Sequence, residues 1–344
     1  MELLQRLSDT PGVSGFEDAV QEIVRGELAQ SCDEVRVDRL GNVIGRRAAR
    51  RAGGSPLKVM LAAHMDEIGF MIKHIDREGF LRFLPIGGFD PRTLIGQRVI
   101  VHGREEVKGV IAPMPNWLQS GEERRKALEL RDLVIDTGRS GDEVRRLLHV
   151  GDVISLAQRF EALNDRVVLG RNFDDRVGVY AMLEAVRRVG ECQVDVYAVA
   201  TVQDEVGLRG VPTAAHAIDP DVGIALDGSL ASDVPYADEQ DRHCTMGAGT
   251  GIYLIDNRTI SDRRLVRFLV QLAEEAGIAY QMNLGGGTDA SIMQRHRTGA
   301  RVCTLGPPTR YMHSTAQLCA QSDIESTIAL LVAFLENAHR GDLG

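Results

Sequence analysis

Histidine and carboxylate side chains gather in five short stretches of this chain, and their types suit the binding of divalent metal ions. The stretches are residues 64–67, 174–176, 204–205, 227 and 312–314, most of them directly after an apolar run. Imidazole and carboxylate ligands accept zinc, cobalt and manganese alike. Two such cations held close together turn water into a nucleophile, so these residues predict a hydrolase with two metal ions.

His64 and Asp66 stand two residues apart at the end of an apolar run that we expect to form a buried strand. Side chains at that spacing lie on the same face of a strand. His64 is therefore a candidate metal ligand, and Asp66 is a candidate for the carboxylate that fixes the tautomer of the imidazole. A histidine satisfied by ordinary hydrogen bonds at a strand end is the simpler alternative.

Two pairs of adjacent acids suggest further roles. Asp174 and Asp175, followed by Arg176, open an expected helix, where Asp174 could bridge two cations or only complement the helix dipole. Asp204 and Glu205 end an apolar run. Glu205 would bind a metal ion and Asp204 would act as the general base that deprotonates water. Two solvated acids in a turn remain the alternative for this second pair.

A glycine-rich turn at residues 284–290 could bring the backbone close to a bound ligand. It contains Gly286, Gly287 and Thr288, which we take as candidate substrate-binding residues. Glycine permits close approach of the backbone, and free N–H groups at the start of a helix attract anions. A plain turn with a threonine or aspartate cap is an equal alternative.

The bulk composition is that of a globular protein rather than a nucleic-acid or membrane protein. The chain has 344 residues, which predicts about two domains, and a net charge of −9. Its one conspicuous basic run, residues 46–51, precedes Gly53 and Gly54 and is expected in a solvated loop. No apolar run approaches the ~18 residues of a membrane span. We therefore expect neither nucleic acid nor a membrane as a partner.

The cysteines indicate a reducing compartment. Their number is five, and no two of them form a CxxC pair. An odd, unpatterned set argues against a disulfide framework. The N-terminus also lacks the apolar segment of a signal peptide, so we expect a soluble, cytoplasmic protein.

Apolar runs alternate with helical patterns in two parts of the chain, and this predicts an α/β fold. Helices on both faces of a mixed, mainly parallel sheet are expected for residues 1–66 and 162–344, the catalytic domain. Between them, residues 67–161 show short alternating strands broken by glycine, proline and aspartate, which predicts an inserted small β-rich domain. Within the α/β part we expect helices from Ser14 to Gln30, with Ser14 as N-cap, and from Asp174 to Val189.

The order His-x-Asp, Asp-Asp-Arg, acid-Glu, Asp, His resembles that of the co-catalytic metallopeptidases. More narrowly, the chain is similar to the glutamyl aminopeptidase family, also called deblocking or tetrahedral aminopeptidases, some of whose members are labelled endoglucanase. The matching stretches are AAHMDEIGFMI at 61–71, FDDRVG at 173–178, TVQDEVGLRG at 201–210, GGTDA at 286–290 and MHS at 312–314. Together with PGVSGFE at 11–17 and DRLGNVIG at 38–45, they spread the resemblance over nearly the whole chain.

The resemblance implies a specific ligand set and an assembly. His64 and Asp227 would bind one metal ion, Glu205 and His313 would bind the other, and Asp174 would bridge the two. Zinc or cobalt is the implied metal, and manganese is also compatible with these ligands. The inserted domain would mediate dimerisation, and dimers would assemble into a dodecamer. The implied reaction is the release of N-terminal amino acids from peptide substrates.

Asp204 departs from the family pattern, which has a glutamate at this place. The side chain is one methylene shorter, and a misplacement of about 1 Å can cost ~100-fold in rate. A non-catalytic metal-binding scaffold is therefore one alternative. A related dinuclear dipeptidase or deacylase is another, although its larger insertion would precede the final histidine rather than follow His-x-Asp. A glycosidase would leave His64 and His313 without a role.

Overall fold

The computed structural model describes residues 1–50 and 56–344, and its larger part is built on an eight-stranded sheet. The central strands β12, β3, β13 and β17 run parallel, whereas β1, β2 and β12 pair antiparallel at one edge. At the other edge β15 is antiparallel to β17 and parallel to β16. In sheet order the strands are β1 (Glu34–Val37), β2 (Val43–Arg47), β12 (Asp195–Thr201), β3 (Lys58–His64), β13 (Val222–Leu226), β17 (Arg301–Gly306), β15 (Thr250–Ile255) and β16 (Tyr280–Leu284).

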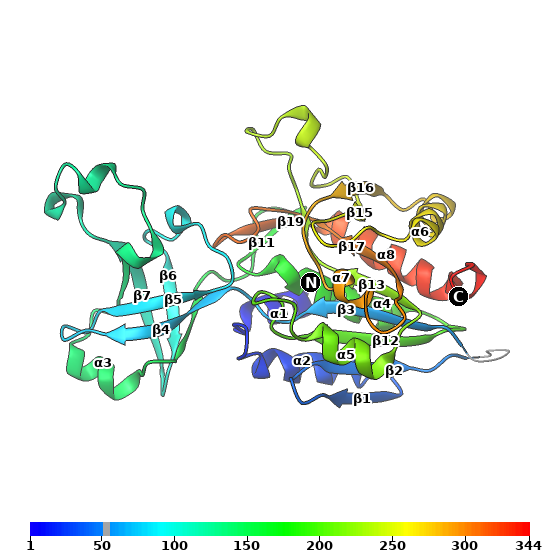
Figure 1. Ribbon diagram of the computed structural model, residues 1–344, viewed down its shortest axis with the longest axis horizontal. Coiled ribbons are helices and arrows are strands. Elements are labelled where there is room, and N and C mark those ends of the chain that lie inside the picture. The colour runs from blue at the N-terminus through cyan, green and yellow to red at the C-terminus, as the bar shows by residue number, and fades with distance from the viewer. Residues whose placement is uncertain (51–55) are drawn as a thin grey trace.

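Helices cover both faces of this sheet, which confirms the predicted mixed α/β fold (Figure 1). One face packs against α1 (Glu2–Asp9), α2 (Asp18–Leu28), α4 (Phe173–Arg188), α6 (Arg263–Ala276) and α8 (Gln321–Asn337). The other packs against α5 (Val211–Ile218) and the short α7 (Ala290–Met293).

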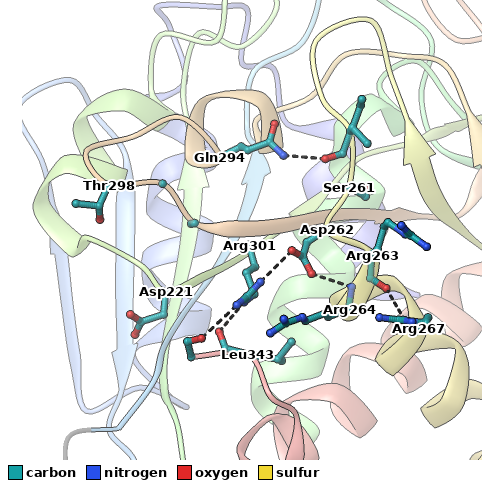
Figure 2. Close-up of a pocket in the computed structure, with 14 residues that line it drawn as sticks. Asp221, Ser261, Asp262, Arg263, Arg264, Arg267, Gln294, Thr298, Arg301 and Leu343 are labelled. Atoms are coloured by element: carbon teal, nitrogen blue, oxygen red, sulfur yellow. Dashed lines mark hydrogen bonds and ion pairs between the residues drawn. The ribbon is translucent and has the colours of Figure 1, made fainter.

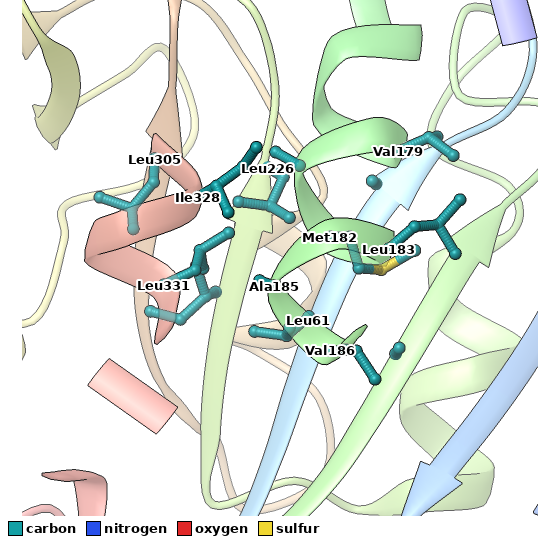
Figure 3. Packing of buried hydrophobic residues seen from close by; sticks show 14 of the residues in the cluster. Leu61, Val179, Met182, Leu183, Ala185, Val186, Leu226, Leu305, Ile328 and Leu331 are labelled. Atoms are coloured by element: carbon teal, nitrogen blue, oxygen red, sulfur yellow. The ribbon is translucent and has the colours of Figure 1, made fainter. Parts of the chain in front are cut away.

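Strand β3 is buried on both faces, which explains its unbroken apolar sequence. Leu61 and its neighbours two residues away contribute to the core beneath α4, whereas Met60 and Ala62 contribute to the core beneath α5. A strand buried on both faces needs apolar residues at every position. Figure 3 shows Leu61 beside Ala185 and Val186 of α4.

A separate closed barrel projects from one side of the main sheet (Figure 1). In order around the barrel its strands are β4 (Gly69–Ile75), β5 (Leu81–Ile86), β8 (Leu133–Asp136), β7 (Glu106–Pro113), β6 (Arg98–His102) and β9 (Val153–Leu156). It also carries α3 (Gly141–Leu147). The barrel has its own core, in which Phe70 stacks on Phe89 and contacts Phe83 edge-on. Closure leaves the barrel no unpaired sheet edge.

A five-stranded sheet between these two parts is absent from the sequence prediction. Its order is β10 (Glu161–Ala162), β11 (Val167–Gly170), β19 (Gln317–Ala320), β18 (Pro308–Arg310) and β14 (Ser229–Leu230). Strands of two to four residues are too short to show a clear alternation. Short 3-10 turns lie at Pro91–Thr93, Asn116–Leu118, Glu123–Arg125, Leu130–Asp132, Glu239–Asp241 and Ala338–Arg340.

Two local predictions are wrong. The helix expected from Ser14 begins at Asp18 instead, and Ser14 does not cap it. The basic run is not simply a solvated loop, because Arg46 and Arg47 end strand β2 and are half-buried. Arg46 pairs with Asp195 at 3.1 Å, so its charge joins strand β2 to strand β12. Residue 51 and the glycines at 53–54 lie outside the described residues.

The cysteines are free, and four of the five are buried. No helix among residues 1–50 and 56–344 combines the length and the apolar character that crossing a membrane requires.

Candidate metal centre

The carboxyl ends of the central strands carry three of the predicted ligand segments. His64 ends β3, the pair Asp204 and Glu205 follows β12, and Asp227 follows β13 directly. In a parallel sheet these ends meet at one edge, where ligands bind. Asp174 enters from the start of α4, and His313 enters from the loop between β18 and β19.

One cavity of about 570 Å³ joins these residues. All five predicted metal ligands line it, and so do the predicted base and the glycine-rich turn. These lining residues are His64, Asp174, Asp204, Glu205, Asp227, Gly286, Gly287, Thr288 and His313. Asp66 is fully buried and does not line the cavity.

Asp174 stands between the two histidines. Its Oδ1 lies 3.1 Å from Nε2 of His64, and its Oδ2 lies 3.2 Å from Nε2 of His313. The same nitrogen of His313 is 3.5 Å from Oε2 of Glu205. Ligand atoms of His64, Asp174 and Glu205 all lie within 4.8 Å of one another. Each oxygen of Asp174 therefore faces a different imidazole, which is the arrangement that a bridging carboxylate needs.

The side chain of Asp174 contacts the two histidines and accepts from no N–H group of α4 in the described part of the chain. Asp174 and Asp175 have non-helical dihedral angles, and the peptide bond between them is cis. The N–H of Asp174 donates to Oε1 of Gln317 at 2.8 Å, and Oδ2 of Asp175 accepts from the N–H of His64 at 3.2 Å. The first acid thus faces the cavity, while the second fixes the backbone of a neighbouring ligand.

Asp66 links three parts of the site. Its Oδ1 lies 3.4 Å from Nδ1 of His64 and accepts from the N–H of Asp204 at 2.9 Å. Its Oδ2 accepts from Oγ of Ser14 at 2.6 Å and from the N–H of Glu205 at 3.1 Å. Although burial alone would raise the pKa of Asp66, these donors and His64 lower it. Asp66 is therefore held as a carboxylate behind the site.

Burial raises the pKa values of three acids in the cavity, and neighbouring carboxylates add to each shift. Burial raises the pKa of Glu205 to about 7, and the charge of Asp174 adds to the effect. Burial, followed by Asp174 and Asp175, raises the pKa of Asp227 well above its usual range. Burial also raises the pKa of Asp204 strongly, with a further contribution from Asp289.

The pKa values of the two histidines are raised as well, and here the cause is the neighbouring carboxylates. A hydrogen bond to Asp174, together with the charge of Glu205, raises the pKa of His313 to about 9. Burial opposes protonation of His64, yet Asp204 and Asp174 raise its pKa well above the usual value. A cavity with this surplus of carboxylates requires positive charge, and divalent cations would supply it. The residues therefore fit a metal centre.

The predicted base lies beside the first ligand. Oδ2 of Asp204 is 3.9 Å from Nε2 of His64. Its Oδ1 is buried and has no hydrogen-bond partner in the described part of the chain. Asp204 lines the cavity, and a carboxylate in that position is available to accept a proton.

Glu67, which had no role in the sequence prediction, holds the N-terminal segment against the site. Glu67 accepts two hydrogen bonds from Arg171, at 2.8 and 3.1 Å, and one from Asn172 at 2.8 Å. Its Oε1 also accepts from the N–H of Gly12 at 2.9 Å. Glu67 and Arg171 are buried, so the charges are compensated inside the protein. The adjacency of Glu67 to the His-x-Asp motif was the available signal.

Asp289 was also missed as a neighbour of the site. It is buried, and its Oδ2 accepts from Oγ1 of Thr201 at 2.7 Å. Asp289 belongs to the GGTDA stretch that resembles the family, but no feature of the neighbouring sequence indicated that its side chain would interact with Asp204.

Known proteins resemble this chain over nearly its full length. The M42 glutamyl aminopeptidase family matches residues 41–330. A lysyl aminopeptidase from Pyrococcus furiosus is 37% identical, with 97% of this chain and 96% of that protein covered.

Two solved structures show the same fold. An aminopeptidase from the archaeon Desulfurococcus kamchatkensis has a TM-score of 0.92 at 39% identity, covering 97% of this chain and 94% of that one. The Pyrococcus horikoshii TET1 peptidase, described as able to assemble into a tetrahedron or a large octahedral shell, has a TM-score of 0.85 at 34% identity. The match covers 97% of this chain and 98% of that one. The sequence motifs, the shared fold and the family match agree, and the chain belongs to the M42 glutamyl aminopeptidase family.

Proposed function

We propose that this protein is a metal-dependent aminopeptidase that removes N-terminal amino acids from peptides. The main support for this proposal is the position of Asp174. Its two carboxylate oxygens lie 3.1 and 3.2 Å from the Nε2 atoms of His64 and His313. Family membership supports the reaction class.

Two divalent cations would be held by five side chains. His64 and Asp227 would bind one, Glu205 and His313 would bind the other, and Asp174 would bridge them. Zinc or cobalt is proposed, with manganese as a further possibility, because these ligands do not discriminate strongly among the three. When bound, such ions lower the pKa of water and polarise a carbonyl group.

The residues of this chain would supply the remaining steps. Asp204 would take the proton of the attacking water and pass it to the leaving amine, since its side chain lines the cavity. Asp66 would hold His64 in one tautomer and fix the backbone of Asp204. The turn formed by Gly286, Gly287 and Thr288 would position the substrate backbone, because it lines the same cavity.

The barrel is proposed as the dimerisation domain. We assign residues 67–161 to it, and residues 1–66 and 162–344 to the catalytic domain. The separate core of the barrel supports this division. We further propose that dimers assemble into a dodecamer, as the tetrahedral assembly described for the Pyrococcus horikoshii relative suggests. Analytical ultracentrifugation of the full chain tests the assembly, and a monomer at micromolar concentration would contradict it.

We place the protein in the cytoplasm, because its five free thiols suit a reducing compartment.

The central experiment is an activity profile over amino-acid amides. Chelator-treated protein should be inactive, and zinc, cobalt or manganese should restore release of the N-terminal residue. Absence of activity with all three metals on a broad panel would favour a non-catalytic metal-binding scaffold. That alternative arises because Asp204 stands where the family has a glutamate.

A further inference from the structure

The barrel reaches the metal centre through one turn, residues 87–90, which directly follows β5. A side chain added at Gly88 would place its Cβ 3.2 Å from Nδ1 and 3.7 Å from Cε1 of His313. The corresponding atom at Gly87 would lie 3.3 Å from Oε2 of Glu205. The backbone of this turn therefore lies against both side chains that are proposed to bind the second cation.

Gly87 has no room for a side chain. Its φ of +81° is in the left-handed region, which glycine adopts without steric cost. A Cβ at this position would also overlap Cγ2 of Ile68, which is buried. Glycine at this position is therefore what allows the turn to approach Glu205 so closely.

The turn is held to the barrel at both of its ends. Before it, Ile86 pairs with Gly69 in the ladder between β5 and β4. At its other end, Phe89 stacks on Phe70 with 4.4 Å between the ring centroids, and Phe70 belongs to the barrel core. Moving the turn would disturb this packing, so its position is set by the barrel rather than by the metal ligands.

His313 is the partner that can move. Its side chain is 45% exposed, whereas the side chains of Asp174 and Glu205 are 7% exposed. Nε2 of the ring lies 3.2 Å from Oδ2 of Asp174 and 3.5 Å from Oε2 of Glu205, while Nδ1 lies toward Gly88. In metal centres the group beside the second ring nitrogen orients a histidine ligand. Gly88 stands at that place.

A larger cavity, of about 940 Å³, lies at the opposite end of the central strands (Figure 2). Asp221, which directly precedes β13, lines it, and none of the proposed metal ligands does. Arg301 in its centre donates to Oδ2 of Asp262 at 3.1 Å and to the carbonyl oxygens of Leu343 and Gly344, each at 3.2 Å. This arginine is thus engaged by the protein itself, and the barrel turn is the contact that can influence the proposed ligands.

We propose that Gly88 is a positioning residue of the metal centre, because its lack of a side chain leaves His313 the place from which Nε2 faces the second cation. This inference rests on the proposed dinuclear function. A Cβ at 3.2 Å from Nδ1 is closer than an ordinary van der Waals contact, so the ring would retreat by a few tenths of an ångström. Binding through His313 and Glu205 should weaken, whereas binding through His64 and Asp227 should not.

The test titrates the chelator-treated full chain with cobalt chloride in isothermal titration calorimetry. The wild type should bind two cobalt ions per chain. Gly88→Ala should bind one of them roughly tenfold more weakly and the other with unchanged affinity, which is the size expected when the support of a ligand is lost. Gly88→Val places a branched side chain at the same contact and should weaken that ion further. The φ of Gly88 is not left-handed, so both substitutions are compatible with the backbone.

Gly109→Ala is the matched control within the barrel. Its Cβ would lie 2.7 Å from Cγ2 of Ile135, which belongs to the barrel core, so it crowds the barrel without touching a proposed ligand. This variant should unfold at a lower urea concentration and keep both cobalt affinities. Gly26→Ala, on α2 with open space around its Cβ, should also keep both affinities.

The outcomes separate this inference from the proposed function. Two cobalt sites in the wild type, with unchanged affinities in both Gly88 variants, would overturn the inference and leave the metal centre standing. An equal loss in Gly109→Ala would also overturn it, because general distortion of the barrel would then explain the effect. A wild type that binds no cobalt would overturn the metal centre, and the role of Gly88 with it.

Discussion

The carboxylate of Asp66 accepts a hydrogen bond from the backbone N–H of Asp204, with 2.9 Å between N and Oδ1. This contact connects the residue that supports His64 with the residue proposed as the base. Because Oδ2 of Asp66 also accepts from the N–H of Glu205 at 3.1 Å, one buried side chain orients a ligand, a base and a second ligand together. Its contribution is therefore testable apart from that of the ligands themselves.

Asp66→Asn should reduce both metal affinity and turnover. An amide nitrogen at either oxygen position cannot accept the N–H groups of Asp204 and Glu205, and the support of His64 weakens. Loss of such an outer carboxylate typically costs ~10–100-fold in metal affinity or activity. Metal content by elemental analysis and kcat/KM on an amino-acid amide measure the effect. Ser14→Ala removes only one donor to Asp66, so its loss should be smaller; an equal loss would contradict the proposed role of Asp66.

His64→Ala and Asp174→Ala should each abolish turnover while the fold remains. Both residues lie at the cavity rather than in the hydrophobic cores. Turnover measured with added metal and circular dichroism of the variants check this expectation. His74→Ala changes an exposed histidine on β4 and serves as the matched control. Near-normal activity in His64→Ala or Asp174→Ala would show that the site is misassigned.

Asp204→Ala should lower kcat by about 10²–10⁴-fold, the usual contribution of a general base, while both metal ions are retained. Elemental analysis together with kcat separates the loss of a base from the loss of a ligand. Asp204→Glu should raise activity, because one more methylene carries the carboxylate further into the cavity that it lines. A large drop in Asp204→Glu would show that the pocket has adapted to the shorter acid.

Glu67→Gln should destabilise the fold by ~3–5 kcal/mol, because it leaves the buried charge of Arg171 without a carboxylate. Urea-induced unfolding at pH 7 measures the difference. Arg92→Gln breaks the exposed pair with Asp90 and should leave the unfolding midpoint unchanged. Equal midpoints for Glu67→Gln and the wild type would mean that the buried cluster does not stabilise the fold.

Glu17, which is not a proposed metal ligand, predicts a pH dependence of stability. Burial raises its pKa from 4.5 to about 7. A raised carboxyl pKa stabilises the fold below pH 4.5, and this contribution disappears as the pH rises through about 7. Glu17→Gln should therefore match the wild type near pH 5 and exceed its stability near pH 8, by about 1–3 kcal/mol. Urea unfolding at the two pH values checks the sign; a variant less stable than the wild type at pH 8 would refute it.

The sequence by itself was enough to propose the ligands of the site and to predict the strands that carry most of them. Three of the predicted ligands line one cavity because the apolar runs before His64, Glu205 and Asp227 form parallel strands whose carboxyl ends meet. The β-rich insertion was also visible, since its short alternating strands differ in period from the α/β part. Both signals are local in the chain.

Only the tertiary structure decided which groups support the site. Ser14 looked like a helix cap, but it donates to Asp66, and the short strands β18 and β19 that bring His313 to Asp174 gave no sequence signal. These contacts join distant segments through packing, and no local periodicity encodes such pairings.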